Sequence, residues 1–450
     1  MNLTKFTRSC LEKFDRVYRS IGFWLTSLHK VFNPRHQNFD LHQQWRNLHF
    51  SRLQSQRLRL GSIGLFATLL IGWTSHSSGA TSPQTMQLPL STRGSQIIDA
   101  IGQPVLLRGV NWFGLETETH APHGLWLRDY KEMLAQIASL GYNTIRLPYS
   151  IASLRSESLT GIDFTIGANR ELEGKTPLEV MDAIIEEAGR QNLTILLDSH
   201  RLNDREIPPL WYDEDYSEAD WIETWKMLAT RYKDRPHVIG ADLKNEPHGI
   251  ASWGTYDITT DWRLAAERAG NAILKIAPHW LIVVEGVENN VPGQQFTHWQ
   301  GGNLEGVKRY PVRLSNPRQL VYSPHEYGAG VFDQPWFSEP TFPGNLLRRW
   351  EVGFHYIATE KIAPIWIGEF GGRQVDETSK EGIWQRKFVE FIGKNDLSFT
   401  YWSWNPNSED TGGILLDDWV EIDRPKQDLL SQLLPASTQQ TRYSVMTHDR

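Results

Sequence analysis

Two glutamates in this chain each follow a short apolar run, and together they could carry out acid–base chemistry. Glu246 follows the run 238–243, and Glu369 follows the run 364–367. Such runs are typical of buried strands, which hold a side chain at the strand end rigidly at the edge of a cleft. One carboxyl group could protonate a leaving oxygen while the other attacks or activates water, as hydrolysis of a glycosidic bond requires. Either glutamate alone could be a solvated strand end, but the pair and its polar neighbours favour catalysis.

Length and charge predict one large globular domain and argue against nucleic acid as its ligand. The chain has 450 residues, 40% of them hydrophobic, enough for one barrel-sized core. Residues 1–60 carry 11 Lys or Arg and 3 acids, a local +8; since the total is −7, the other 390 residues sum to −15 (35 basic, 50 acidic). An acidic body is a poor partner for nucleic acid. The 19 tryptophans exceed what such a core needs, and flat aromatic faces suit sugar rings.

The sequence predicts a reaction that needs no metal and no other cofactor. Cys10, the only cysteine, lies in the basic N-terminal part, so the rest of the chain has no disulfide, thiolate nucleophile or thiolate-bound zinc. His325-Glu326 has no histidine at position 329, which a zinc-binding His-Glu-x-x-His helix would need.

Strand-like and helix-like segments alternate between about residues 95 and 435, and they must position the two glutamates. The runs expected as strands are 105–113, 142–149, 193–199, 238–245, 281–286, 320–326, 364–369 and 399–404. Amphipathic stretches such as 128–140, 177–191, 219–232 and 261–276 are expected as helices. Eight strands alternating with helices predict an α/β fold, a (β/α)8 TIM barrel that forms a single catalytic domain.

One hydrophobic segment precedes the barrel. The run 60–73 is uncharged, Arg52, Arg57 and Arg59 precede it, and small residues follow at 78–80. Its length suits the core of a signal peptide, cleaved after position 80, better than a membrane span of about 20 residues. The alternatives are an uncleaved anchor, a true start nearer Arg52, and a buried helix of an N-terminal domain. In the signal and anchor interpretations, the arginines place the barrel outside the cytoplasmic membrane, exported or tethered.

The sequence therefore divides into five parts. They are a basic tail 1–60, a signal or anchor segment 61–80, a linker 81–94, the barrel 95–435 and a C-terminal tail 436–450. If the anchor is retained, the chain associates with the membrane through 60–80, and the basic tail could bind anionic lipid.

Polar and aromatic residues collect at the carboxyl ends of the expected strands, where the active site of such a barrel lies. The strand bodies, in contrast, are mostly Val, Ile and Leu. The end residues are Asn111, Trp112, Phe113, Arg146, Asp198, Ser199, His200, Asn245, Glu246, Glu285, Gly286, His325, Glu326, Tyr327, Glu369, Trp402, Ser403 and Trp404.

The chain resembles glycoside hydrolase family 5, in clan A of the barrel glycosidases, and most of all its bacterial endoglucanase subfamily 1. The matching motifs are GVNWFG (109–114), HGLW (123–126), GYNTIRLPYS (141–150), NEPH (245–248), DWRLAAERAGN (261–271), GEFG (368–371), WSWNP (402–406) and DTGGIL (410–415). The resemblance covers nearly all of 95–435. It departs from the family in lacking the cysteines that some relatives carry and an appended binding module.

The resemblance implies a retaining double displacement with Glu246 as the acid/base and Glu369 as the nucleophile. The two carboxyl groups of such a pair lie about 5–5.5 Å apart, so one of them keeps its proton near neutral pH. Arg146 and the Tyr327 hydroxyl would keep Glu369 ionised by charge and hydrogen bonding.

The resemblance also implies supporting and substrate-binding residues. Asn245 would hold the sugar 2-hydroxyl, and His200 and His325 would orient the glutamates. Trp402 would be the sugar platform beside the scissile bond, with Trp112, Trp299 and His123 as further substrate contacts. Trp126 is another candidate, but a core position is favoured for it, and Asp198 and Glu326 are expected to be structural. Arg146, His200 and His325 could each, taken alone, be structural as well.

The expected function is that of an endo-β-1,4-glucanase that acts on cellulose-type β-glucan chains as a monomer. One alternative is the same mechanism on β-mannan, xyloglucan or mixed-linkage glucan. An alternative of another class is an inactive, surface-anchored glycan-binding protein, which would be expected to lack Glu246 or Glu369.

Overall fold

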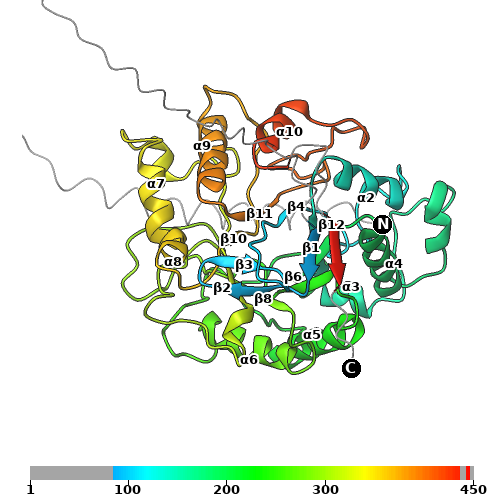
Figure 1. Cartoon of the computed structure of the whole chain (residues 1–450), viewed down its shortest axis with the longest axis horizontal. Coiled ribbons are helices and arrows are strands. Elements are labelled where there is room, and N and C mark those ends of the chain that lie inside the picture. Colours follow the sequence, from blue (N-terminus) through cyan, green and yellow to red (C-terminus); the bar gives the residue numbers. More distant parts are fainter. Residues whose placement is uncertain (1–84, 436–441, 446–450) are drawn as a thin grey trace, which may run out of the picture. The chain divides into compact units, whose positions relative to one another are not determined.

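The computed structural model describes residues 85–435 and 442–445 of the chain. Within them, eight strands form one parallel sheet in the order β10-β11-β4-β5-β6-β7-β8-β9 (Figure 1). The strands are β4 (Arg108–Asn111), β5 (Thr144–Ser150), β6 (Thr194–Arg201), β7 (Val238–Asp242), β8 (Leu281–Glu285), β9 (Leu320–Ser323), β10 (Trp366–Ile367) and β11 (Ser398–Tyr401). Tyr322 of β9 bridges Ile365, next to β10, in parallel, so the sheet closes on itself. The expected (β/α)8 arrangement is confirmed.

The predicted strands are all present, but six of the eight end earlier than the sequence suggested, whereas β5 and β6 end one and two residues later. β7 ends at Asp242, so Asn245 and Glu246 lie in the loop after it. β10 is only two residues long, and Glu369 follows it. The apolar run continues beyond the last ladder hydrogen bond because the strand end stays packed in the core.

Helices surround the barrel, as Figure 1 shows. They are α2 (Tyr130–Ser139), α3 (Ile151–Arg155), α4 (Pro177–Arg190), α5 (Glu218–Tyr232), α6 (Trp262–Leu274), α7 (Asn345–Trp350), α8 (Tyr356–Thr359), α9 (Lys380–Lys394) and α10 (Arg424–Ser431). Short 3-10 helices η1 (Gly167–Leu172), η2 (Pro317–Gln319) and η3 (Pro335–Ser338) and a π-helical segment η4 (Glu351–His355) accompany them. Side-chain caps fix where α2, α4 and α5 begin, three of the four helices that the sequence predicted. Asp129 accepts the N–H of Lys131 at the start of α2, and Thr176 forms a capping box with Glu179 at the start of α4.

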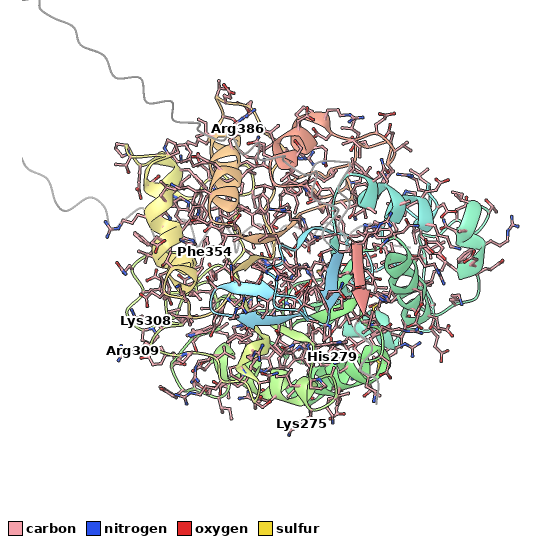
Figure 2. The ribbon with its side chains drawn as sticks, viewed as in Figure 1. Lys275, His279, Lys308, Arg309, Phe354 and Arg386 are labelled. Atoms are coloured by element: carbon pink, nitrogen blue, oxygen red, sulfur yellow. The ribbon has the colours of Figure 1, made fainter. Side chains whose placement is uncertain are left out.

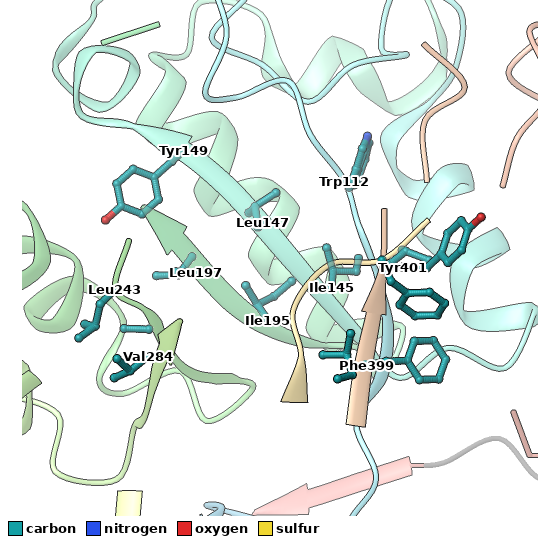
Figure 3. Close-up of a cluster of buried hydrophobic side chains, with 14 of the residues drawn as sticks. Trp112, Ile145, Leu147, Tyr149, Ile195, Leu197, Leu243, Val284, Phe399 and Tyr401 are labelled. Atoms are coloured by element: carbon teal, nitrogen blue, oxygen red, sulfur yellow. The ribbon is translucent and has the colours of Figure 1, made fainter. Parts of the chain in front are cut away.

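Successive strand residues belong to two different apolar clusters, one on each face of the sheet. Ile195 and Leu197 of β6 lie in the large cluster beneath the helices (Figure 3), whereas Leu196 between them lies in a smaller cluster inside the barrel. Ile145 and Leu147 of β5 share the large cluster with them. Because both faces are buried, the strands appear in the sequence as continuous apolar runs rather than alternating ones.

The segment expected as a linker is partly folded, which corrects the prediction for 81–94. It contains β1 (Thr85–Leu88) and β2 (Ser91–Arg93), and β2 pairs antiparallel with β3 (Gln96–Ile98). Leu88 and Leu90 are buried in the smaller cluster, against strand residues of the barrel interior. These strands cover the amino-terminal end of the barrel because apolar side chains there would otherwise face water.

Part of the expected C-terminal tail also belongs to the fold, which corrects the prediction for 442–445. These residues form β12 (Arg442–Val445), which pairs in parallel with β1. Tyr443 packs against the smaller cluster, and its hydroxyl donates a hydrogen bond of 2.8 Å to the carbonyl of Gly189 in α4. Segments expected as a linker and as a tail therefore pair with each other at one end of the barrel.

Many charged side chains lie at the periphery of the folded body. Lys275, Lys308 and Arg386 reach outward, whereas Phe354 lies inside the outer layer (Figure 2). No helix within 85–435 or 442–445 has the length and hydrophobicity to span a bilayer. The hydrophobic run 60–73 and the basic tail lie outside the described residues, so the signal or anchor segment remains a prediction.

Candidate active site

A cavity of about 410 Å³ opens at the carboxyl ends of the barrel strands. Seven of the predicted site residues line it: His200, Asn245, Glu246, Trp299, Tyr327, Glu369 and Trp402. Arg146 and His325 are fully buried and contact the lining carboxylates from below. The fold thus brings most of the predicted site together in one place.

Tryptophans of the outer helices anchor the strand ends that carry the site. The indole N–H groups of Trp221 and Trp225 in α5 both donate to the carbonyl of Leu243, at 3.0 and 3.1 Å. Trp262 at the start of α6 donates to the carbonyl of Glu285 at 2.9 Å. Each bond satisfies a buried carbonyl just past or at a strand end, which would otherwise lack a partner. The loop with Glu246 therefore begins from a fixed point.

The two glutamates face each other at short range. A carboxylate oxygen of Glu246, one of Glu369 and a ring nitrogen of His325 all lie within 4.8 Å of one another. Carboxyl groups about 5–5.5 Å apart suit direct attack by one of them, whereas about 6.5–9.5 Å leaves room for a water molecule. The geometry therefore suits a retaining displacement.

Arg146 forms the centre of the charge network beneath the cavity. It makes ion pairs with four carboxylates: Asp198 at 3.1 Å, Asp242 at 2.8 Å, Glu285 at 3.1 Å and Glu369 at 2.6 Å. Burial acts to lower the pKa of Arg146, but these carboxylates raise it well above its ordinary value. Burial raises the pKa of Asp198 to about 7 and that of Asp242 to about 6, while the charge of Arg146 acts to lower both.

Glu369 accepts a hydrogen bond on each carboxylate oxygen. Arg146 Nη1 donates to Oε1 and the hydroxyl of Tyr327 donates to Oε2, both at 2.6 Å. Donors on both oxygens fit the ionised form. Burial opposes them and raises the pKa of Glu369, while the positive charges of His325 and Arg146 lower it.

Glu246 has a different set of contacts and is more exposed. Its side chain is 14% exposed against 4% for Glu369. Oε1 lies 3.1 Å from Nδ1 of His325, and within the described residues no hydrogen bond reaches Oε2. Burial acts to raise the pKa of Glu246, but the hydrogen bond and charge of His325 outweigh it and lower the pKa. Oε2 is thus available to exchange a proton with a molecule in the cavity.

His325 and His200 carry different charges because their surroundings differ. Burial acts to lower the pKa of His325, but Glu285, Glu369 and Glu246 raise it well above its ordinary value, so the ring is protonated. Burial lowers the pKa of His200 to about 3, so this ring is neutral and donates from Nδ1 to Asp198 at 2.7 Å.

Trp402 lies in a stack of rings at the cavity wall. Its ring is half-buried and nearly parallel to those of Phe113 and His200, with centroids 5.2 and 5.3 Å away. Its indole N–H donates to the hydroxyl of Ser408 at 3.2 Å. The stack and the hydrogen bond fix the ring orientation, as a sugar platform requires.

The prediction that Trp112 contacts substrate is wrong. Its side chain is fully buried in the large cluster (Figure 3), and its indole N–H donates to the carbonyl of His123 at 3.0 Å. The preceding residue, Asn111, points into the barrel and accepts a hydrogen bond from Arg146 at 3.0 Å. Because successive strand residues point to opposite faces, Trp112 must point toward the helices.

The other aromatic candidates, Trp299, His123 and Trp126, differ in whether they line the cavity and in how exposed they are. Trp299 lines the cavity but is only 9% exposed, with its edge against Tyr327 and Trp336. His123 does not line the cavity and packs against Phe113 and Trp126. Among the described tryptophans only Trp126 and Trp402 are not buried. The sequence favoured Trp112 over Trp126 as a substrate contact, but Trp126 is the more exposed of the two.

Two features of the site were not predicted. Asp242 and Glu285 share Arg146 with the nucleophile candidate, a contact that depends on closure of the barrel. Phe332 lines the cavity with 63% of its surface exposed, in a loop whose path no sequence pattern specifies. The alternation of strand residues was the available signal for Glu285, since Val284 beside it lies in the outer cluster.

The residues do not favour a metal ion at this site. Asp242, Glu285 and His325 bring three potential ligand atoms within 4.8 Å of one another. Both carboxylates already form ion pairs with Arg146, however, and a protonated imidazole has no lone pair to offer a metal.

Comparisons with known proteins agree with this fold. The sequence model of the cellulase family (glycosyl hydrolase family 5) matches residues 98–408. An endoglucanase of Paenibacillus polymyxa is 50% identical over 373 residues, covering 82% of this chain and 94% of that protein. The major extracellular endoglucanase of Xanthomonas campestris pv. campestris is 42% identical over 341 residues, covering 75% and 69%.

Solved structures show the same likeness. The endocellulase of the archaeon Pyrococcus horikoshii has a TM-score of 0.73 to this chain at 44% identity, covering 78% of this chain and 99% of that one. A structure of that endocellulase in complex with cellotetraose gives the same TM-score and identity. The matched region contains both strand-end glutamates and nearly the whole barrel, and the chain belongs to the cellulase family, glycosyl hydrolase family 5.

Proposed function

We propose that this chain is a retaining endo-β-1,4-glucanase, with Glu246 as the acid/base and Glu369 as the nucleophile. The observation that carries the proposal is the separation of the two carboxyl groups, with atoms within 4.8 Å of each other. The first step forms a bond between Glu369 and the anomeric carbon while Glu246 gives its proton to the leaving oxygen. In the second step Glu246 takes a proton from water, which displaces Glu369.

The proton must lie on Glu246 when substrate is bound. In the free site, His325 lowers the pKa of Glu246 and burial raises that of Glu369, which draws a shared proton toward Glu369. A glycosidic oxygen beside Glu246 accepts a hydrogen bond only from the protonated carboxyl group, so binding favours that form. Arg146 and Tyr327 then hold Glu369 ionised.

The relatives and the residues that line the cavity support the proposed substrate class. The Paenibacillus and Xanthomonas relatives are endoglucanases, and the Pyrococcus endocellulase has been captured with cellotetraose. Trp402 supplies a fixed aromatic face and Asn245 a polar group at the same cavity. We therefore assign cellulose-type β-glucan as the substrate, with β-mannan, xyloglucan and mixed-linkage glucan as the competing choices.

One experiment tests both parts of the proposal. Residues 81–450 are incubated with soluble cellulose, β-mannan, xyloglucan and mixed-linkage glucan, and new reducing ends are measured. Proton NMR of freshly cleaved cello-oligosaccharide then reports the anomeric form before mutarotation. We expect fastest cleavage of soluble cellulose and β-configured products. Inverted products would refute Glu369 as the nucleophile, and faster cleavage of another glycan would change the assigned substrate.

We also propose that the catalytic domain acts outside the cytoplasmic membrane. The run 60–73, with arginines before it and small residues at 78–80, supports export, and the Xanthomonas relative is described as extracellular. N-terminal sequencing of the mature protein tests this. A start near Thr81 supports cleavage, an intact chain in the membrane fraction supports an anchor, and a full-length chain in the cytoplasm contradicts both.

A further inference from the structure

Glu285 is a buried carboxylate that contacts the acid/base candidate but does not line the cavity. It ends β8, and its side chain is fully buried. Oε2 accepts a hydrogen bond of 2.7 Å from the backbone N–H of Glu246. Oε1 lies 3.3 Å from Nε2 of His325, whose other nitrogen contacts Oε1 of Glu246 at 3.1 Å. One carboxylate therefore reaches both the backbone and, through a histidine, the side chain of Glu246.

The backbone contact stabilises an unusual conformation. Glu246 has φ of +50°, in the left-handed region that residues with a Cβ rarely adopt. Pro247 follows it and restricts the backbone further. Since the N–H of Glu246 points to Oε2 of Glu285, loss of this acceptor would leave a donor without a partner at the residue that must be placed most accurately.

A glycine on the neighbouring loop leaves room for the contact between Glu285 and the backbone of Glu246. Gly301 packs so closely that a Cβ there would lie 2.5 Å from Oε2 of Glu285 and 3.4 Å from the Cα of Glu246. Gly301 also has φ of +71°, which favours glycine. A larger residue at 301 would displace the carboxylate oxygen from Glu246.

The charges around Glu285 fit its ionised form. Arg146 and His325 face Oε1, and Lys244 lies close enough for Glu285 to act on its pKa, which burial lowers to about 8. The negative charge of Asp242 in β7 acts the other way and raises the pKa of Glu285. Burial raises the pKa of Glu285, whereas His325 and Arg146 lower it. Both of its oxygens face donors, so a proton on Glu285 would have no acceptor.

We propose that Glu285 is the positioning residue of the acid/base: it fixes the backbone of Glu246 with one oxygen and orients the carboxyl group of Glu246 through His325 with the other. The inference rests on the proposed role of Glu246. Glu285 does not touch substrate, so its effect should appear only where the proton from Glu246 is needed.

The leaving group of the substrate tests this directly. Glu285→Gln keeps the side-chain shape, but its amide places an NH2 group against either the N–H of Glu246 or the donors of Arg146 and His325. Two substrates are compared by kcat/KM: cellotetraose, whose leaving oxygen needs a proton, and dinitrophenyl β-cellobioside, whose leaving group needs none. For Glu285→Gln we expect a loss of about 100-fold or more with cellotetraose and a change within about threefold with the aryl substrate.

Two further variants keep the test informative if Glu285→Gln folds poorly. Gly301→Ala pushes on Oε2 without changing any charge, and should show the same selective loss, about tenfold with cellotetraose. Glu267→Gln is the matched control. Like Glu285, Glu267 on α6 accepts hydrogen bonds from an arginine side chain and from a backbone N–H: Arg263 and the N–H of Arg313 each donate to it at 3.0 Å. The control should leave both substrates unchanged.

The outcomes separate this inference from the proposed function. If Glu246→Ala shows the selective loss but Glu285→Gln and Gly301→Ala lose equally on both substrates or on neither, Glu285 is not a positioning residue and Glu246 keeps its role. If Glu246→Ala itself lacks the selectivity, the proposed function fails first. Adding Glu285→Gln to Glu246→Ala should cause no further loss, since the proton donor is already absent.

Discussion

The hydroxyl group of Tyr327 donates a 2.6 Å hydrogen bond to Oε2 of Glu369. Arg146 donates to the other oxygen at the same distance, so the carboxylate is held in one orientation with both oxygens occupied. Burial raises the pKa of Glu369 and the charge of Arg146 acts against it, and a carboxylate whose orientation is already set is ready to attack. The network under the cavity therefore gives two chemically identical side chains different surroundings, which fits the different roles proposed for them.

Removing the Tyr327 hydroxyl should slow the reaction and shift its pH dependence. Tyr327→Phe deletes a donor to the ionised form of Glu369, which raises the pKa of Glu369. The acidic limb of kcat/KM should move to higher pH, and kcat should fall about tenfold to 100-fold. A pH profile of soluble cellulose hydrolysis measures both, and an acidic limb that stays in place would contradict the assigned hydrogen bond.

Substrate binding should move the alkaline limb of the pH profile. The limb in kcat/KM reports the free site, where His325 lowers the pKa of Glu246, and the limb in kcat reports the complex. Because the glycosidic oxygen favours protonated Glu246, the limb in kcat should lie at higher pH than the limb in kcat/KM. Initial rates with cellotetraose over pH 4 to 9 provide both curves, and coincident limbs would argue against transfer of the shared proton.

Azide should distinguish the two glutamates. In Glu369→Ala, turnover should be abolished, and azide should restore part of it with an azide product of inverted configuration. In Glu246→Ala, aryl substrates with good leaving groups should still glycosylate Glu369, and azide should speed release with retention. Product configuration by NMR is the measurement, and the opposite pattern would exchange the two roles.

Glu326 should make the protein less stable as pH rises. Burial raises the pKa of Glu326 to about 7, against the charge of Arg349, so the folded protein keeps a proton there that the unfolded chain releases near its ordinary pKa of 4.5. Stability from this group is therefore full below pH 4.5 and is lost as pH rises through about 7, at about 1.4 kcal/mol per pH unit. Glu326→Gln should remove this loss. Urea unfolding should show a higher free energy of unfolding for the variant than for the wild type at pH 8 but not at pH 5.

Two tryptophans should respond differently to truncation. Trp112→Ala should lower the free energy of unfolding by about 3–5 kcal/mol, because its ring is fully buried in the core. Trp402→Ala should cost less stability, since its ring is half-buried, but should weaken substrate turnover strongly. Thermal unfolding and kcat/KM on the same pair of proteins decide this; equal losses of stability would place Trp402 in the core instead.

The sequence by itself determined the architecture and the family, and it supplied the two glutamates that are proposed as catalytic. Eight apolar runs separated by amphipathic stretches allow few other folds than the barrel, and the motifs around Glu246 and Glu369 carry the family likeness. These are local signals, since a run of apolar residues and a polar residue after it are both visible along the chain.

The tertiary structure decided what depends on side-chain direction and on closure of the sheet. Trp112 looked like a cavity residue until the barrel placed Asn111 inside and therefore Trp112 outside. The parts assigned to a linker and a tail pair with each other as β1 and β12, over more than 350 residues of intervening chain. Glu285 gave no sign of reaching Glu246, because the contact spans two neighbouring strands that only the folded barrel brings into register. Such contacts arise from the packing of distant segments, which no local pattern encodes.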